Sequence, residues 1–95
     1  MSAYIIFTRV KTLDPAEMKI YNDNVRETIK GHNVKILAAY GRKEVLEGPE
    51  HEGIVLMEFP TMEEAKAWYE SPAYLKVRVH RFNGAEYRAV IVEGL

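Results

Sequence analysis

An acidic residue interrupts an apolar strand pattern at Glu58. It follows Ile54 and Leu56 on one face of a predicted strand, where the alternation favours a third apolar side chain. A carboxylate there could act as a general base or anchor a ligand, because burial or a neighbouring arginine shifts its pKa. The structural alternative is an ion pair, for which the chain offers Arg9 on a neighbouring parallel strand, Arg81 or Arg88.

Arg81 is the second residue whose type suggests chemistry. Its planar guanidinium can bind a carboxylate through two parallel hydrogen bonds, which is the clamp that a small acidic metabolite requires. The alternative is a structural link between the segment after Ser71 and either Glu58 or a strand end. Because an unpaired buried charge is costly, we expect Glu58 and Arg81 to reach each other or one shared polar pocket.

Three more residues complete the candidate pocket. Tyr21 and Trp68 are predicted on helix faces that point toward a sheet, where an aromatic side chain either forms core or lines a pocket. His80 could shuttle a proton or ligate haem if it points into a cavity. Otherwise it places a favourable charge near a helix C-terminus.

The sequence contains no motif for metal binding, thiol chemistry, phosphate binding or nucleophilic catalysis. The three histidines have no HxH or HExxH spacing, cysteine is absent, and no glycine-rich loop follows a strand. No nucleophile motif is present either. The sequence therefore predicts no metal and no cofactor, and the catalytic residues, if the protein is an enzyme, stay unknown.

The segments that must position these residues begin with clear helix signals. Thr61 precedes Glu64 by three residues in a capping-box pattern, and Ser71 and Asp14 each stand before a proline suited to a first helical turn. The helix after Asp14 is predicted to run to about residue 30 and to stop near Gly31. Its inward face would carry Met18, Tyr21, Val25 and Ile29.

Four strands are predicted between and around these helices, at about residues 3–10, 34–46, 54–59 and 86–93, with Gly41 able to host a bulge or a bend in the second. The order βαββαβ predicts one domain over residues 1–95. It is typical of a ferredoxin-like α+β sandwich, in which a four-stranded, mainly antiparallel sheet carries its helices on one face.

The predicted strands are too apolar for a sheet that exposes one face to solvent. The segments YIIF, KILAAY, IVLM and AVIV are apolar on both parities, so both sheet faces need cover. The chain has no further element for the second face. We therefore expect a homodimer whose open sheet faces pack together, which makes a dimeric α/β barrel.

Composition limits the partners. Thirteen basic and 14 acidic residues give a net charge of -1, which argues against nucleic acid. The apolar run from Tyr4 to Phe7 is too short for a signal peptide or a membrane span, so we expect a cytoplasmic protein with no membrane partner. A basic cluster could attract a small anion or could be a solvated helix face; it comprises Lys76, Arg78, His80, Arg81 and Arg88.

Residues along nearly the whole chain carry a resemblance to an uncharacterised bacterial family. They are Glu58, Phe59, Pro60, Ala65, Trp68, Tyr69, Ser71, Pro72, Tyr74, Arg81, Ala85, Val92, Glu93 and Gly94, with further matches at Asp14, Tyr21, Gly41, Leu46, Glu47 and Gly48. This pattern is similar to the domain-of-unknown-function family 1330. At His80 the chain departs from it, since related chains often carry an apolar residue there.

The resemblance implies a dimeric α/β barrel without an established activity. The wider superfamily holds cofactor-free oxygenases, lactone isomerases, haem-handling enzymes and ligand-sensing modules, so fold analogy leaves the chemistry open. We expect a homodimer that binds a small molecule, with an acidic metabolite as the candidate ligand. The alternative is a small cofactor-independent enzyme, monooxygenase-like or isomerase-like, with a pocket between the sheet and the helices.

Overall fold

The computed structural model describes residues 1–95 and contains eight elements. In chain order they are β1 (Ala3–Thr12), α1 (Pro15–Asn24), the 3-10 helix η1 (Val25–Ile29), β2 (Lys35–Ala39), β3 (Gly53–Phe59), α2 (Met62–Tyr69), α3 (Pro72–Gly84) and β4 (Ala85–Glu93). The strands form one sheet in the order β2-β3-β1-β4, and every neighbouring pair is antiparallel. This is the predicted ferredoxin-like sandwich.

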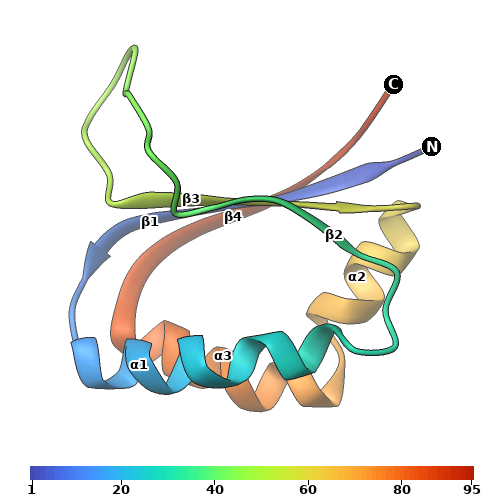
Figure 1. The fold of residues 1–95 in the computed structure, drawn as a ribbon, viewed down its shortest axis with the longest axis horizontal. Coiled ribbons are helices and arrows are strands. Elements are labelled where there is room, and N and C mark those ends of the chain that lie inside the picture. Colours follow the sequence, from blue (N-terminus) through green and yellow to red (C-terminus); the bar gives the residue numbers. More distant parts are fainter.

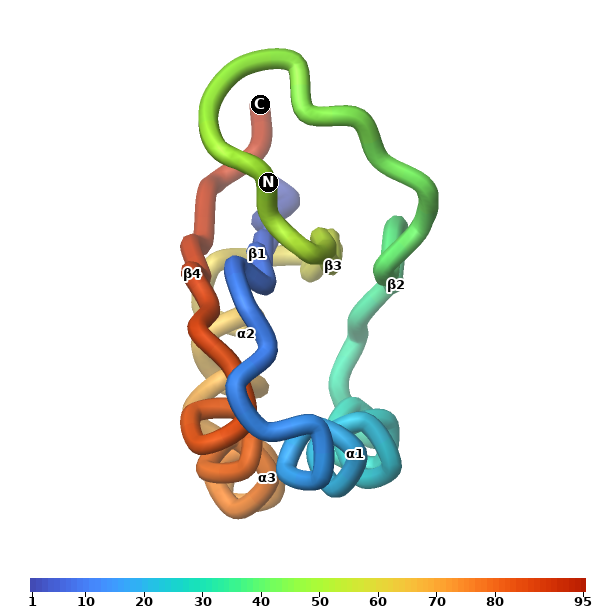
Figure 2. Tube along the Cα trace, turned by 90° about the vertical axis from the view of Figure 1, so that its left-hand side faces the viewer, coloured from blue at the N-terminus to red at the C-terminus, as the bar shows by residue number.

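The helices cover one face of the sheet and leave the other open (Figure 1). Figure 2 shows α1 and α3 side by side below the strands, with the loop between β2 and β3 arching above them. That loop and the C-terminal end both rise on the open side of the sheet. Within one chain the sheet is therefore open, so a barrel would need a second copy. No helix combines the length and the apolarity that a bilayer crossing requires.

The predicted helix starts are confirmed by their capping hydrogen bonds. Asp14 Oδ1 accepts from the Ala16 amide at 3.0 Å, and Thr61 Oγ1 accepts from the Glu64 amide at 3.1 Å. Ser71 Oγ accepts from the Tyr74 amide at 3.2 Å. Each bond satisfies an amide that the first helical turn leaves free, which is why these short polar residues start the helices.

Two predicted elements differ from the structure. The second strand was predicted over residues 34–46 but spans only Lys35–Ala39, because Tyr40 adopts a positive φ of 55° and ends it. Its register shift lies between Ile36 and Ala38, and the bend lies at Tyr40, so neither the bulge nor the bend that was considered for Gly41 falls on that residue. The helix predicted to residue 30 changes to a 3-10 helix at Val25, which turns its last side chains relative to α1.

The core is an aromatic cluster between the sheet and the helices. Trp68, 1% exposed, lies with its ring centroid 4.2 Å from that of Tyr74 and 5.9 Å from that of Phe59. Its Nε1 donates to Thr28 Oγ1 at 3.1 Å, so α2 is tied to η1. This bond satisfies the one polar atom of a buried indole.

Gly84 joins the end of α3 to the start of α1. Its carbonyl accepts from the amides of Leu13 and Asp14 at 2.8 and 2.9 Å. A Cβ at this position would lie 2.8 Å from Met18 Cγ, closer than side chains tolerate. The start of α1 can therefore approach the end of α3 only because residue 84 has no side chain.

Candidate functional site

A cavity of about 440 Å³ lies between the sheet and the α1–η1 segment. Eleven of its 13 lining residues are hydrophobic. They come from all four strands, from α1, η1 and α2, and they include Phe7, Val25, Ile29, Val55, Met57 and Trp68. This volume and this lining are typical of sites for small organic ligands.

The cavity opens beside β2, one of the two edge strands. All five residues of β2 are exposed, and Ile36 is 44% exposed although it lines the cavity. Ala39 and Tyr40, where the strand ends, line it as well. The early end of β2 and the 3-10 conformation of η1 thus leave a space that neither element fills.

Most polar groups around the cavity are already paired. The hydroxyls of Tyr21 and Tyr74 form a hydrogen bond of 2.8 Å, and the hydroxyls of Tyr40 and Tyr87 form a second hydrogen bond. No carboxylate and no imidazole lines the cavity. The lining therefore lacks a side chain of the types that usually serve as general bases near neutral pH.

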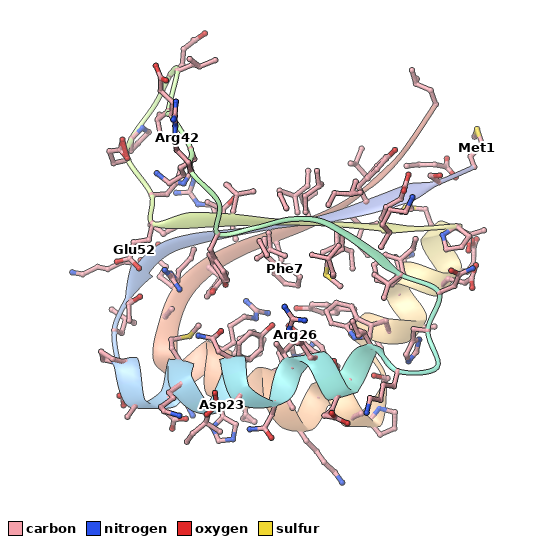
Figure 3. The ribbon with its side chains drawn as sticks, in the orientation of Figure 1. Met1, Phe7, Asp23, Arg26, Arg42 and Glu52 are labelled. Carbon is pink, nitrogen blue, oxygen red and sulfur yellow. The ribbon has the colours of Figure 1, made fainter.

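Arg26 is the one charged residue in the lining, and Asn22 lies one turn before it. Figure 3 shows Arg26 pointing from the helical layer toward the sheet, while Asp23 points away from it. Sequence reasoning missed both Asn22 and Arg26. The signal that could have found them is their spacing of four, which places them together on a helix face adjacent to Tyr21 and Val25.

Arg81 is buried in the core and does not line the cavity, although it was predicted there. It is 3% exposed, and its Nε and Nη2 lie 3.3 and 3.4 Å from the hydroxyls of Tyr74 and Tyr69. Its Cζ also lies 5.0 Å from the ring centroids of Phe7, Phe82 and Tyr87. Phenol oxygens and aromatic faces, not a carboxylate, therefore compensate this buried charge.

Glu58 lies on the opposite face of the sheet from Arg81. It pairs in register with Tyr4, whereas Arg81 contacts Phe7, which has the other parity on β1. The prediction that Glu58 and Arg81 share a pocket was therefore wrong. Glu58 raises the pKa of Tyr4 through a hydrogen bond and through the negative charge of the carboxylate.

The predicted pair between Glu58 and Arg9 was also wrong. Because β1 and β3 are antiparallel, Arg9 faces Gly53 at the far end of the strand from Glu58. Arg9 instead forms an ion pair with Glu52, whose Oε1 lies 3.0 Å from Nε. Arg88 pairs in register with Thr8, also far along the strands from Glu58, and no ion pair joins the two.

Of the other three predicted pocket residues, two line the cavity and one does not. Tyr21 and Trp68 both line the cavity while belonging to the core, so the structure brings these two together. His80 does not line it: its Nδ1 lies 2.5 Å from Glu17 Oε2 in a contact that joins α3 to α1. The chain holds no group of three histidine, aspartate or glutamate residues arranged to ligate a metal ion.

The buried tyrosine pair predicts how stability depends on pH. Burial raises the pKa of Tyr21 and of Tyr74, whereas phenols in an unfolded chain ionise near pH 10. The folded protein thus keeps protons that the unfolded chain loses, so stability is unaffected below about pH 10 and falls as pH rises from there toward the folded pKa. We expect a loss of roughly 1.4 kcal/mol per pH unit for each phenol.

Denaturant unfolding measured from about pH 8 to pH 11 checks this expectation. Tyr21→Phe removes one of the two phenols and should make the alkaline slope shallower by about 1.4 kcal/mol per pH unit. An identical slope in Tyr21→Phe would contradict the assignment.

Comparison with known proteins identifies relatives of the chain. The family model described as domain of unknown function (DUF1330) matches residues 2–95. A protein of unknown function from Rhodopseudomonas palustris has a similar structure, with 13% identity, a TM-score of 0.77 and coverage of 99% of this chain and 82% of that one. No curated protein matches the chain.

Two further solved structures are similar. A dimeric ferredoxin-like protein of unknown function from Thermobifida fusca is 12% identical, with a TM-score of 0.67 and coverage of 99% of this chain and 92% of that one. A putative antibiotic biosynthesis monooxygenase from Nitrosomonas europaea is 23% identical, with a TM-score of 0.62 and coverage of 100% and 99%. At these identities the likeness shows the fold alone.

Proposed function

We propose a small-molecule binding function for this protein, which belongs to the family described as domain of unknown function, DUF1330. The family name assigns no activity, so the proposal rests on the cavity. Its volume of about 440 Å³ and its 11 hydrophobic lining residues suit a small, mainly apolar molecule. The absence of cysteine fits a reducing compartment, and we place the protein in the cytoplasm.

The lining favours binding over catalysis. The hydroxyls of Tyr21, Tyr40 and Tyr87 each have a tyrosine partner, and the lining offers neither an acid nor a histidine. A cofactor-independent oxygenase is the second candidate, because the similar Nitrosomonas europaea protein is described as a putative monooxygenase. Such an enzyme would consume oxygen in the presence of its substrate, which an oxygen electrode measures directly.

The functional unit that we propose is a homodimer that packs through the open sheet face. Val90 and Leu56 flank Ile6 in register on this face, and Val90 is 54% and Val92 47% exposed. Apolar side chains on the face that the helices do not cover need a partner surface of the same character. The similar Thermobifida fusca protein is described as dimeric, which supports a second copy as that partner.

The loop between β2 and β3 fits the same arrangement. It rises on the open side of the sheet, and it carries Leu46, which is 87% exposed (Figure 1). A second sheet that covers the face would lie beside this loop. An apolar side chain at that position then gains a contact that the single chain does not provide.

Ligand-induced thermal stabilisation tests the binding function. We expect small apolar molecules from a screen of acids, quinones and neutral aromatics to raise the melting midpoint, because a ligand selective for the folded state stabilises it. Ala39→Phe fills the mouth of the cavity and should abolish the rise caused by every hit. If no compound stabilises the wild type, or if Ala39→Phe responds as the wild type does, the cavity is not the binding site.

A further inference from the structure

We propose that the ligand carries a single carboxylate and that Arg26 binds it at the mouth of the cavity. This inference rests on the proposed binding function, since it concerns the same cavity. It differs from the expectation drawn from the sequence, which gave the clamp to Arg81. Arg81 has its neighbouring tyrosines and aromatic rings as partners in the core, whereas Arg26 lines the cavity.

The acids nearest to Arg26 in the chain are already paired with other cations. Asp23 Oδ2 lies 2.7 Å from Lys19 Nζ, and Glu27 Oε2 lies 3.0 Å from Lys30 Nζ. Arg26 itself has no ion pair and no hydrogen bond to the protein, although its guanidinium offers five donors. Its charge is therefore available to an external partner.

The direction of the side chain supports the same conclusion. Arg26 points toward the sheet, over a lining that is otherwise almost entirely hydrophobic (Figure 3). A cation that served only solubility would point outward, as the acidic side chain of Asp23 does in the same view. Arg26 is exposed to solvent and also lies against apolar walls, so an anion beside it meets less competition from water than it would on an open surface.

The lining also limits the kind of anion. One guanidinium balances one negative charge, so a monoanion fits, while a phosphate dianion would keep charge that no other lining residue compensates. The planar fork of Arg26 matches a carboxylate through two parallel hydrogen bonds. Asn22, one turn earlier, adds an amide within the same lining. The body of the ligand would lie against Phe7, Trp68 and Tyr87, which suits an aromatic or branched aliphatic group.

A pair of probes of equal size separates the charge from the apolar body. Para-tert-butylbenzoate carries the carboxylate, and para-tert-butylbenzyl alcohol is its neutral counterpart. Binding can be followed by the fluorescence of Trp68, because it is the sole tryptophan and it lines the cavity. Calorimetry of the same titrations gives an independent dissociation constant.

The variants are Arg26→Gln, Arg26→Lys and, as a control, Lys76→Gln, which removes one positive charge from α3 without touching the cavity lining. We expect the wild type to bind the benzoate at least tenfold more tightly than the alcohol. Arg26→Gln should lose about tenfold or more of benzoate affinity, with alcohol binding unchanged within about twofold. Arg26→Lys should fall between, because it keeps the charge and loses the fork.

Each alternative result is decisive. Equal binding of both probes, unchanged in Arg26→Gln, would overturn the carboxylate inference while leaving the cavity as a binding site. An equal loss of benzoate affinity in Lys76→Gln would also overturn it, since bulk charge and not Arg26 would then be responsible. Failure of the wild type to bind either probe, with no hit from the wider screen, would overturn the binding function and this inference together.

Discussion

Trp68→Ala is expected to lower the free energy of unfolding by about 3 to 5 kcal/mol. The indole is 1% exposed and is packed against the rings of Tyr74 and Phe59, so its removal leaves a large void in the core. The change also removes the donor to Thr28 Oγ1, a buried hydroxyl that then loses one of its partners. Urea unfolding of both proteins measures the difference.

Trp68→Phe is the matched comparison. It keeps an aromatic ring at the centre of the cluster but loses part of the volume and the Nε1 donor, so its cost should be clearly smaller than that of Trp68→Ala. Because Trp68 also lines the cavity, ligand binding should weaken in both variants. A Trp68→Ala protein with an unchanged melting midpoint but no ligand response would mean that the residue serves the cavity alone.

Val90→Glu is expected to convert the proposed dimer into monomers at micromolar concentration. Val90 lies on the open face beside Ile6, on the edge strand β4, and a two-fold interface would bury the new carboxylate twice. A weakening of about a hundredfold or more follows from burying a charge without a partner. Sedimentation velocity of wild type and variant gives both association states.

Leu75→Glu provides the control for that experiment. Leu75 is an exposed apolar residue on α3, in the layer of helices away from the open face, so the same substitution there should leave the association state unchanged. A wild-type protein that sediments as a monomer at micromolar concentration would remove the basis of the dimer. A Val90→Glu dimer as stable as the wild type would place the interface elsewhere.

Local signals predicted the fold well. The caps at Asp14, Thr61 and Ser71 depend on residues within three positions of one another, so the sequence alone carries the whole interaction. The order of elements then restricted the topology to very few possibilities. The end of β2 escaped prediction because KILAAY continues the apolar pattern, and only the left-handed backbone at Tyr40 stops the strand.

The candidate site was harder to predict because it depends on strand direction and on side-chain partners. Placing Glu58 beside Arg9 assumed a parallel pair, and one reversed strand moves the two residues to opposite ends. Arg81 was assumed to need an acid, whereas tyrosine hydroxyls and aromatic rings surround it. Arg26 was overlooked because an arginine on a helix surface is ordinary until the cavity beside it is known.

The position of β1 in the sheet determines when the chain can fold. β1 lies between β3 and β4, and Ala3 pairs in register with Glu93, so the pairing of β1 is complete only after β4 has been made. A ribosome adds about 5 to 20 residues per second, so the edge of β1 that pairs with β4 stays without its partner strand for several seconds. Such long-range pairing also slows the folding of the released chain relative to a helical bundle of this size. The apolar strand β1 therefore has an unpaired edge that is open to aggregation until β4 has been made.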